Sequence, residues 1–307
     1  MDETLQSYLK SLYENTIKIA TNKLREFVVL DFTQDFKKQY PKIKSLKNNE
    51  KNEEDIKVYK IPCNIKITEA EVKYRKCLDV RRWMCMSRPQ YSKSCGLTSV
   101  VSCWNYLYST LGTGLLPPIP QEEAMTVLGF NPPFGKIKFG PSTGNTTLLK
   151  WFRVLNRHYR VKGEASFLWK AAGNFATPDI DEKKALSLLE DGLRTDTSAF
   201  IYHCYNHYCC PIGFEITSDQ PTEAYKPLTQ FSSGEEHWII IAEPSKGYPV
   251  FHVKKWSEIV KDISTKYPEY YNIRKPKKGI MRFKEAAYVT GKMAGCNPHC
   301  IMIFKKL

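Results

Sequence analysis

Apolar residues recur every three or four positions in several stretches of the first two thirds of the chain, a pattern that predicts amphipathic helices. The clearest stripe begins at Cys95 and consists of Leu97, Val100, Val101, Trp104, Leu107, Tyr108 and Leu111. Gly112 and Gly114 follow it and favour a helix end. The pattern therefore predicts one long helix that starts at Cys95.

Shorter helices are predicted over residues 120–129 and 181–193. Another begins near residue 143, with Thr143 or Asn145 as its N-cap. The second half of the chain instead contains runs of β-branched and aromatic residues, at 199–205, 208–216, 237–243, 250–253 and 301–304, with one helix at 256–267. Helices first and strands afterwards indicate an α+β fold with an antiparallel sheet.

The N-terminal part of the chain differs from the rest. Residues 3–27 have imperfect helical periodicity, and residues 42–58 are polar and charged like a linker. From residue 59 the composition becomes globular, and β-branched alternation over residues 56–67 suggests one or two strands. We therefore predict an N-terminal helix and linker at 1–58 and a folded domain at 59–307.

Composition limits the class of protein. Hydrophobic residues make up 42% of the chain and aromatic residues 13%, which is typical of a folded protein. No apolar run is long enough to cross a bilayer, and the acidic N-terminus does not resemble a signal peptide. We expect a cytoplasmic and/or nuclear protein whose ten cysteines are reduced.

Positive charge is concentrated near the C-terminus. The net charge is +14, and residues 254–307 contain 13 Lys or Arg against four Asp or Glu. Such a segment can bind an acidic protein or nucleic acid. One interpretation of the chain is therefore a non-enzymatic, basic binding module of the nucleus or cytoplasm.

The start of the long predicted helix has the features of a nucleophilic site. A thiol attacks as the thiolate, which the positive end of a helix stabilises, and Cys95 stands at that end. Gly96 leaves room for a substrate carbonyl beside the backbone. The side-chain amide of Gln90, five residues upstream, is a candidate donor to an oxyanion.

A thiol nucleophile needs a histidine base and a group that orients it. His207 and His237 each begin a predicted strand. The strand after His207 ends at Glu243, so neighbouring antiparallel strands bring that carboxylate to His207. No acid follows His237 in the same way, and we favour His207 over His237.

Histidine and cysteine also crowd into residues 203–210. Opposed Cys-x2-Cys pairs at zinc-finger spacing are absent from the sequence. We predict no metal and no cofactor.

Two resemblances add to this interpretation. Gln90-x4-Cys95-Gly96, the strand from His207 and the acid-Pro pair at Glu243 resemble the double-glycine, bacteriocin-processing type of papain-like cysteine peptidase. In this chain the Gln-to-Cys spacing is one residue short, Glu replaces the usual Asp or Asn, and residues 217–236 form an insertion.

Longer runs, at residues 77–83, 87–91, 102–110, 139–147 and 202–208, resemble the basic immunoglobulin-like variable motif-containing protein family. That resemblance implies a cytoplasmic or nuclear protein and does not define a reaction. An immunoglobulin domain is not expected, because Cys95 and Trp104 are predicted to share a helix.

The sequence therefore predicts a papain-like α+β domain whose nucleophile helix packs on an antiparallel sheet. Its predicted catalytic residues are Cys95, His207, Glu243 and Gln90. The expected function is hydrolysis of peptide or amide bonds in a peptide or protein substrate, or an inactive relic of that activity. The alternative is the basic binding module.

Overall fold

The computed structural model describes residues 67–139, 143–171, 176–205, 207–266, 269–282 and 297–307. All of them belong to the unit Asn64–Leu307. The predicted N-terminal helix and polar linker lie outside the described residues, as do the strands predicted before residue 67. The domain boundary at residue 58 thus stays a prediction.

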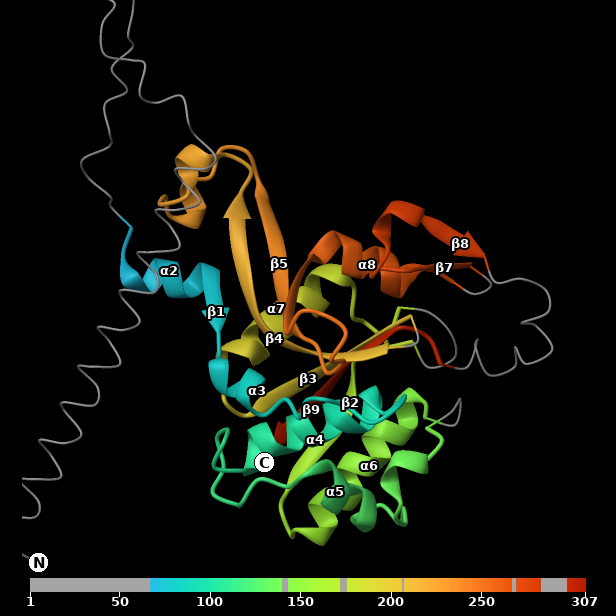
Figure 1. Cartoon of the computed structure of the whole chain (residues 1–307). Helices are drawn as coiled ribbons and strands as arrows, with labels where there is room; N and C mark the ends of the chain where they lie inside the picture. The colour runs from blue at the N-terminus through green and yellow to red at the C-terminus, as the bar shows by residue number, and fades with distance from the viewer. Residues whose placement is uncertain (1–66, 140–142, 172–175, 206, 267–268, 283–296) are drawn as a thin grey trace, which may run out of the picture. The chain divides into compact units, whose positions relative to one another are not determined.

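Most α-helices precede most strands along the described chain (Figure 1). The α-helices are α2 (Glu69–Arg75), α3 (Val80–Met84), α4 (Cys95–Tyr108), α5 (Gln121–Val127), α6 (Asn145–His158), α7 (Glu182–Arg194) and α8 (Trp256–Ser264). The strands are β1 (Lys76–Leu78), β2 (Gly163–Trp169), β3 (Ser198–Cys204), β4 (His207–Ser218), β5 (Glu235–Ala242), β6 (Phe251–Lys255), β7 (Glu269–Tyr271), β8 (Ile280–Arg282) and β9 (Cys300–Lys306). Short 3₁₀ turns are η2 (Phe134–Lys136), η3 (Pro221–Glu223), η4 (Leu228–Gln230) and η5 (Pro276–Lys278).

Seven of these strands form one antiparallel sheet in the order β2-β9-β3-β4-β5-β6, with β1 paired to β4. Strands β7 and β8 form a separate antiparallel pair. The predicted combination of helices with an antiparallel sheet is confirmed. Cys95 and Trp104 do share helix α4.

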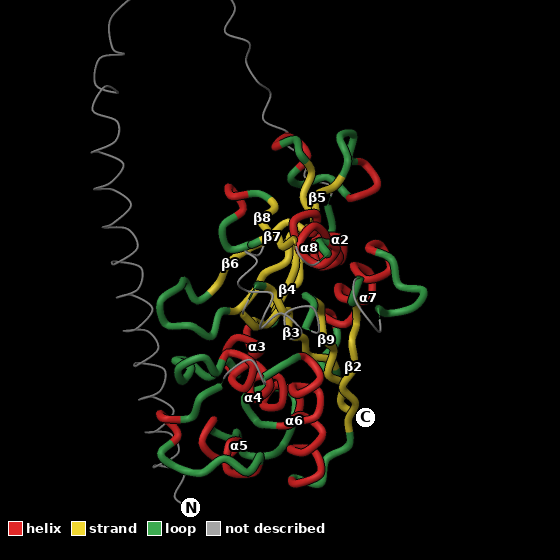
Figure 2. Tube along the Cα trace, turned by 90° about the vertical axis from the view of Figure 1, so that its right-hand side faces the viewer, coloured by secondary structure: helices red, strands yellow, loops and turns green. Residues whose placement is uncertain are grey.

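Each face of the sheet contributes to its own core. On β3, Ala199 and Ile201 join the cluster that includes α4, α5 and α6, whereas Phe200 and Tyr202 join the one that includes α7 and α8. This alternation follows from the two-residue period of a strand. Figures 1 and 2 both show α4, α5 and α6 grouped together, apart from α7 and α8.

Strand β4 links the two ends of the sheet. Its first residues pair with β3, its later residues pair with β1, and its other edge pairs with β5. Gly213 lies opposite Leu78, and a Cβ atom there would lie 2.2 Å from the Cys77 carbonyl oxygen. Only glycine therefore allows β1 to approach so closely.

Two predicted details were wrong, and several strands were not predicted. Helix α4 ends at Tyr108 rather than near Leu111, because Ser109 turns to extended backbone and its hydroxyl bonds the Asn105 carbonyl. The N-cap of α6 is Gly144, so neither Thr143 nor Asn145 caps it. Strand β2, which pairs with β9, was not predicted.

Arg82 of α3 joins distant parts of the fold. Its side chain is buried and donates to the carbonyl oxygens of Ser198 at 2.6 Å and Thr195 at 2.7 Å. It also donates to Gly192 near the C-terminus of α7, where the helix dipole favours a cation. The guanidinium carbon lies 4.1 Å from the centre of the Tyr106 ring.

We predict that Arg82→Leu lowers the free energy of unfolding by about 3 kcal/mol, because several buried carbonyls lose a charged donor. Arg81→Leu is the matched control: Arg81 is exposed on the same helix and pairs with Asp79, so its loss should cost less than about 1 kcal/mol. Urea unfolding of both variants measures the difference. Equal losses would contradict the role assigned to Arg82.

Candidate active site

Cys95 is the first residue of α4 and is 9% exposed. The Ser94 hydroxyl bonds the Tyr91 carbonyl at 3.1 Å, and the Ser94 carbonyl accepts the Thr98 N–H at 2.9 Å, which fixes the first turn. The backbone N–H groups of a first helical turn have no partners within the helix. The Cys95 thiol therefore lies at the positive end of the helix dipole.

A buried glutamine on α5 holds the segment that leads to Cys95. The Gln121 amide donates to the Ser87 hydroxyl at 3.0 Å and to the Pro89 carbonyl at 3.2 Å. Its oxygen accepts from the Thr98 hydroxyl on α4 at 2.6 Å. Gln121 thus fixes residues 87–89 against the nucleophile helix, a role that the sequence did not reveal.

Arg88 connects the same segment to the loop that follows β5. Its guanidinium donates to the carbonyl oxygens of Ser245 at 2.8 Å and Tyr248 at 3.1 Å. Glu243 lies at the start of this loop, directly after β5. Arg88 therefore ties the segment before Cys95 to the loop that begins with Glu243.

His207 and Glu243 form a buried pair at the ends of adjacent strands. His207 is the first residue of β4 and Glu243 follows the last residue of β5, which pairs with β4. His207 Nε2 lies 2.7 Å from Glu243 Oε1, and the two side chains are 4% and 0% exposed. The Nε2–H does not point straight at the carboxylate, so the contact is a close ion pair rather than a linear hydrogen bond.

An interaction with the Cys95 side chain is one of the causes that raise the pKa of His207, which brings the thiol and the imidazole within reach of each other. Because Nε2 faces Glu243, the other ring nitrogen, Nδ1, is left for the thiol. Burial lowers the pKa of His207, but the interactions with Cys95 and Glu243 outweigh it and raise the pKa to about 10. Burial raises the pKa of Glu243, but His207 and the Ser245 backbone N–H outweigh it and hold the pKa at about 2.

Gln90 lies in the segment held by Gln121 and Arg88. Its Oε1 atom is buried, and no described residue donates a hydrogen bond to it. Rotation of the Gln90 side-chain amide by half a turn exchanges its oxygen and its NH2 group. The NH2 group, a hydrogen-bond donor, would then occupy the buried position.

His237 lies at the opposite end of β5 from Glu243. Strand β5 rises about 3.3 Å per residue, so six residues place the two Cα atoms about 20 Å apart. His237 instead pairs with Glu190 of α7 at 2.7 Å and with Glu235 at 3.2 Å. Of the two histidines considered, His207 is the one in contact with Cys95.

The residues around this trio come from three distant parts of the chain. Tyr208 stacks on His203, and its hydroxyl donates to Asn145 Oδ1 at 3.0 Å and accepts from Asn297 at 3.1 Å. Asn145 also donates to the Pro298 carbonyl at 2.8 Å. Asn145 therefore ties α6 to the start of β9, and its side chain does not cap a helix.

The other cysteines and histidines of residues 203–210 pack within the fold. Cys204 is paired in register with His207, and its side chain shares a hydrogen bond with Cys209 on the α7 and α8 face. His203 contacts the Pro298 carbonyl, and burial lowers its pKa to about 3. Within the described ranges, no group of three or more His, Cys, Asp or Glu side chains is arranged to hold a metal ion.

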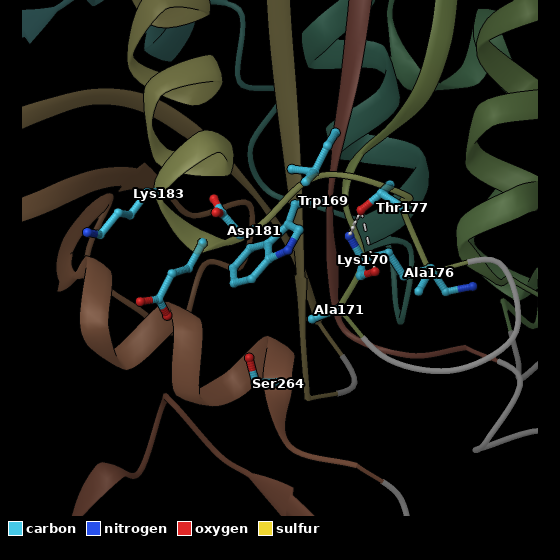
Figure 3. A pocket seen from close by; sticks show the side chains of 10 residues that line it. Trp169, Lys170, Ala171, Ala176, Thr177, Asp181, Lys183 and Ser264 are labelled. Carbon is cyan, nitrogen blue, oxygen red and sulfur yellow. Dashed lines mark hydrogen bonds between the residues drawn. The ribbon is translucent and has the colours of Figure 1, made fainter.

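A separate hollow of about 580 Å³ lies between the end of β2, the start of α7 and the end of α8 (Figure 3). Trp169, Lys170, Asp181 and Ser264 line part of it. Asp181 is the N-cap of α7, and its carboxylate accepts a hydrogen bond from the Lys184 backbone N–H.

Some basic residues of the C-terminal segment are engaged inside the fold. The Lys254 ammonium donates to the Ile273 carbonyl at 2.9 Å, and the Arg274 guanidinium lies 4.1 Å from the centre of the Tyr248 ring. The binding of an acidic protein or nucleic acid by this segment stays a prediction. No helix in the described part of the chain is long and apolar enough to cross a bilayer.

We predict that the His207 imidazole stays protonated until the pH approaches 10, whereas the partly buried His252 stays neutral down to about pH 4. Ring NMR signals of both histidines across a pH series test this. A His207 midpoint near its ordinary value of 6.5 would contradict the ion pair.

The same shifts set the pH dependence of stability. The folded-state pKa of His207 is raised. Its contribution to the free energy of unfolding is therefore fully present below about pH 6.5 and is lost as the pH rises towards 10. The folded-state pKa of Glu243 is lowered. Its contribution to the free energy of unfolding is therefore fully present above about pH 4.5 and is lost as the pH falls towards 2. The excess stability of wild type over His207→Gln should shrink across the alkaline range.

Comparison with known proteins places the chain in a family. Residues 71–307 match the model of the basic immunoglobulin-like variable motif-containing protein family. A relative of that name from Xenopus tropicalis is 52% identical over 237 residues, and the human relative is 49% identical over the same length. Each match covers 77% of this chain and 46% of the relative, so the chain spans about half the length of these relatives.

A more distant relative from Giardia intestinalis is 29% identical over 238 residues, which covers 69% of this chain and 83% of the relative. No solved structure matches the chain. The family match covers the whole described part of the chain except residues 67–70, including the site around Cys95. The chain therefore belongs to the basic immunoglobulin-like variable motif-containing protein family.

Proposed function

We propose that the chain is a papain-like thiol hydrolase that cleaves peptide or amide bonds. One observation carries the proposal: a cysteine at a helix N-terminus, a histidine and a buried carboxylate contact one another in that order. A thiol nucleophile needs both partners, a base that takes its proton and an acid that orients the base.

The proposed reaction starts with a Cys95 thiolate and a His207 imidazolium. The sulfur attacks the substrate carbonyl carbon, and the carbonyl electron pair moves onto oxygen. His207 then gives its proton to the leaving nitrogen as the C–N bond breaks. The products of this half are a free amine, a thioester on Cys95 and a neutral His207.

Water completes the cycle. His207 takes a proton from a water molecule, whose oxygen attacks the thioester carbonyl, and the C–S bond breaks. The carboxylic acid leaves, and the thiolate–imidazolium pair is restored. Glu243 keeps its negative charge throughout and stabilises the imidazolium, since its pKa lies far below neutral pH.

The oxyanion formed in each half needs hydrogen-bond donors. The Cys95 backbone N–H is available at the start of α4. The Gln90 amide is the proposed second donor, in the orientation that turns its NH2 group inward. Its buried oxygen supports this role because no residue in the described part of the chain supplies a donor there.

We predict that iodoacetamide alkylates Cys95 about tenfold faster in wild type than in His207→Gln, because the imidazolium favours the reactive thiolate. Cys77 is the internal control: burial raises the pKa of its thiol although it is more exposed than Cys95. Mass spectrometry of digested protein follows both cysteines. Equal rates at Cys95 in wild type and His207→Gln would favour the alternative, a non-enzymatic basic binding module.

We predict that Gln90→Ala slows acylation of Cys95 by p-nitrophenyl acetate about a hundredfold, the cost of losing one oxyanion donor. Alkylation by iodoacetamide should not change, because that displacement creates no oxyanion. Comparison of the two rates on the same variant separates the proposed role from a general disturbance of the site. A parallel fall in both rates would assign Gln90 to packing instead.

A further inference from the structure

The two oxygens of the Glu243 carboxylate have different surroundings. Oε1 lies 2.7 Å from His207 Nε2 and accepts the Ser245 backbone N–H at 3.0 Å. Oε2 is buried, and no described residue donates a hydrogen bond to it. An ionised oxygen without a partner is costly in a buried site. The Ser245 side chain also lowers the pKa of Glu243, but of the two carboxylate oxygens only Oε1 has hydrogen-bond geometry to a described residue.

His252 faces the free side of this carboxylate. It lies on β6, next to β5, and is paired in register with Ile241. Its Nδ1 atom is 3.9 Å from Glu243 Oε2, and its side chain is 25% exposed. The neighbouring residues Phe251 and Val253 are exposed on β6. His252 is thus the polar group of β6 that approaches the candidate site.

The charges around His252 favour its neutral form. Burial and the positive charges of Lys254, His207 and Arg274 together lower its pKa to about 4, against the attraction of Glu243. A neutral imidazole with hydrogen on Nδ1 can donate to Oε2 without competing as a cation for the carboxylate. A shift of about 1 Å brings the two atoms to hydrogen-bond distance.

We propose that His252 is a positioning residue that donates from Nδ1 to Glu243 Oε2 and fixes the plane of the carboxylate, so that Oε1 stays directed at His207. The inference rests on the proposed thiol hydrolase function. In this proposal His252, on the edge strand β6, is the fourth residue in the series of contacts that begins with Cys95, His207 and Glu243. His252 does not touch the substrate.

The test compares His252→Leu with His252→Asn. The asparagine amide nitrogen takes nearly the place of Nδ1 and keeps a donor, whereas leucine has a similar shape and no donor. Val253→Thr is the matched control, since Val253 is 49% exposed on the same strand. The readouts are the rate of Cys95 alkylation by iodoacetamide at neutral pH and the His207 pKa from ring NMR.

His252→Leu should slow alkylation about tenfold and lower the His207 pKa by about one unit, because a loose carboxylate stabilises the imidazolium less. His252→Asn and Val253→Thr should stay within about twofold of wild type. A His252→Leu variant that behaves like wild type would overturn the inference. Equal losses in the leucine and asparagine variants would also overturn it, because packing rather than donation would then explain them.

His207→Gln separates this inference from the proposed function. If His207→Gln leaves Cys95 alkylation unchanged, the proposed thiol hydrolase site itself fails. If His207→Gln slows alkylation while His252→Leu does not, the function stands and only the role of His252 is rejected.

Discussion

The close contact between His207 and Glu243 is the interaction on which the candidate site depends. Both side chains are almost completely buried, so each charge requires the other. The pair raises the pKa of the imidazole and lowers that of the carboxylate. It also directs one ring nitrogen at Glu243 and leaves the other for Cys95. Without this pair, Cys95 would be one more buried thiol among the cysteines of the core.

The fold holds that pair between elements that are far apart in sequence. Pairing of β4 with β5 brings His207 and Glu243 together at neighbouring strand ends, and packing of α4 on the same sheet brings up Cys95. Gln121 and Arg88 then fix the segment before Cys95 to α4 and to the loop after Glu243. Strand pairing, helix packing and the hydrogen bonds of Gln121 and Arg88 therefore bring together residues that are far apart in sequence.

Strong periodic patterns predicted much of this arrangement. The apolar stripe after Cys95 marked the start of α4, and β-branched runs marked β3, β4 and β5. The same runs led to the choice of His207 with Glu243, whose catalytic roles remain a proposal. The sequence did not indicate Gln121 or His252, because each acts on a partner that only the tertiary fold brings near. Asn145 was misassigned for the same reason: its partner, the Pro298 carbonyl, is 153 residues away.

In the proposed site, Cys95, His207 and Glu243 act as one unit. A double-mutant cycle with His207→Gln, Glu243→Gln and the double variant measures this most directly, with the acylation rate of Cys95 by p-nitrophenyl acetate as the readout. If Glu243 acts only through His207, the double variant should be no slower than His207→Gln alone. Losses that simply add in the double variant would mean that the two residues act independently, and would contradict the account.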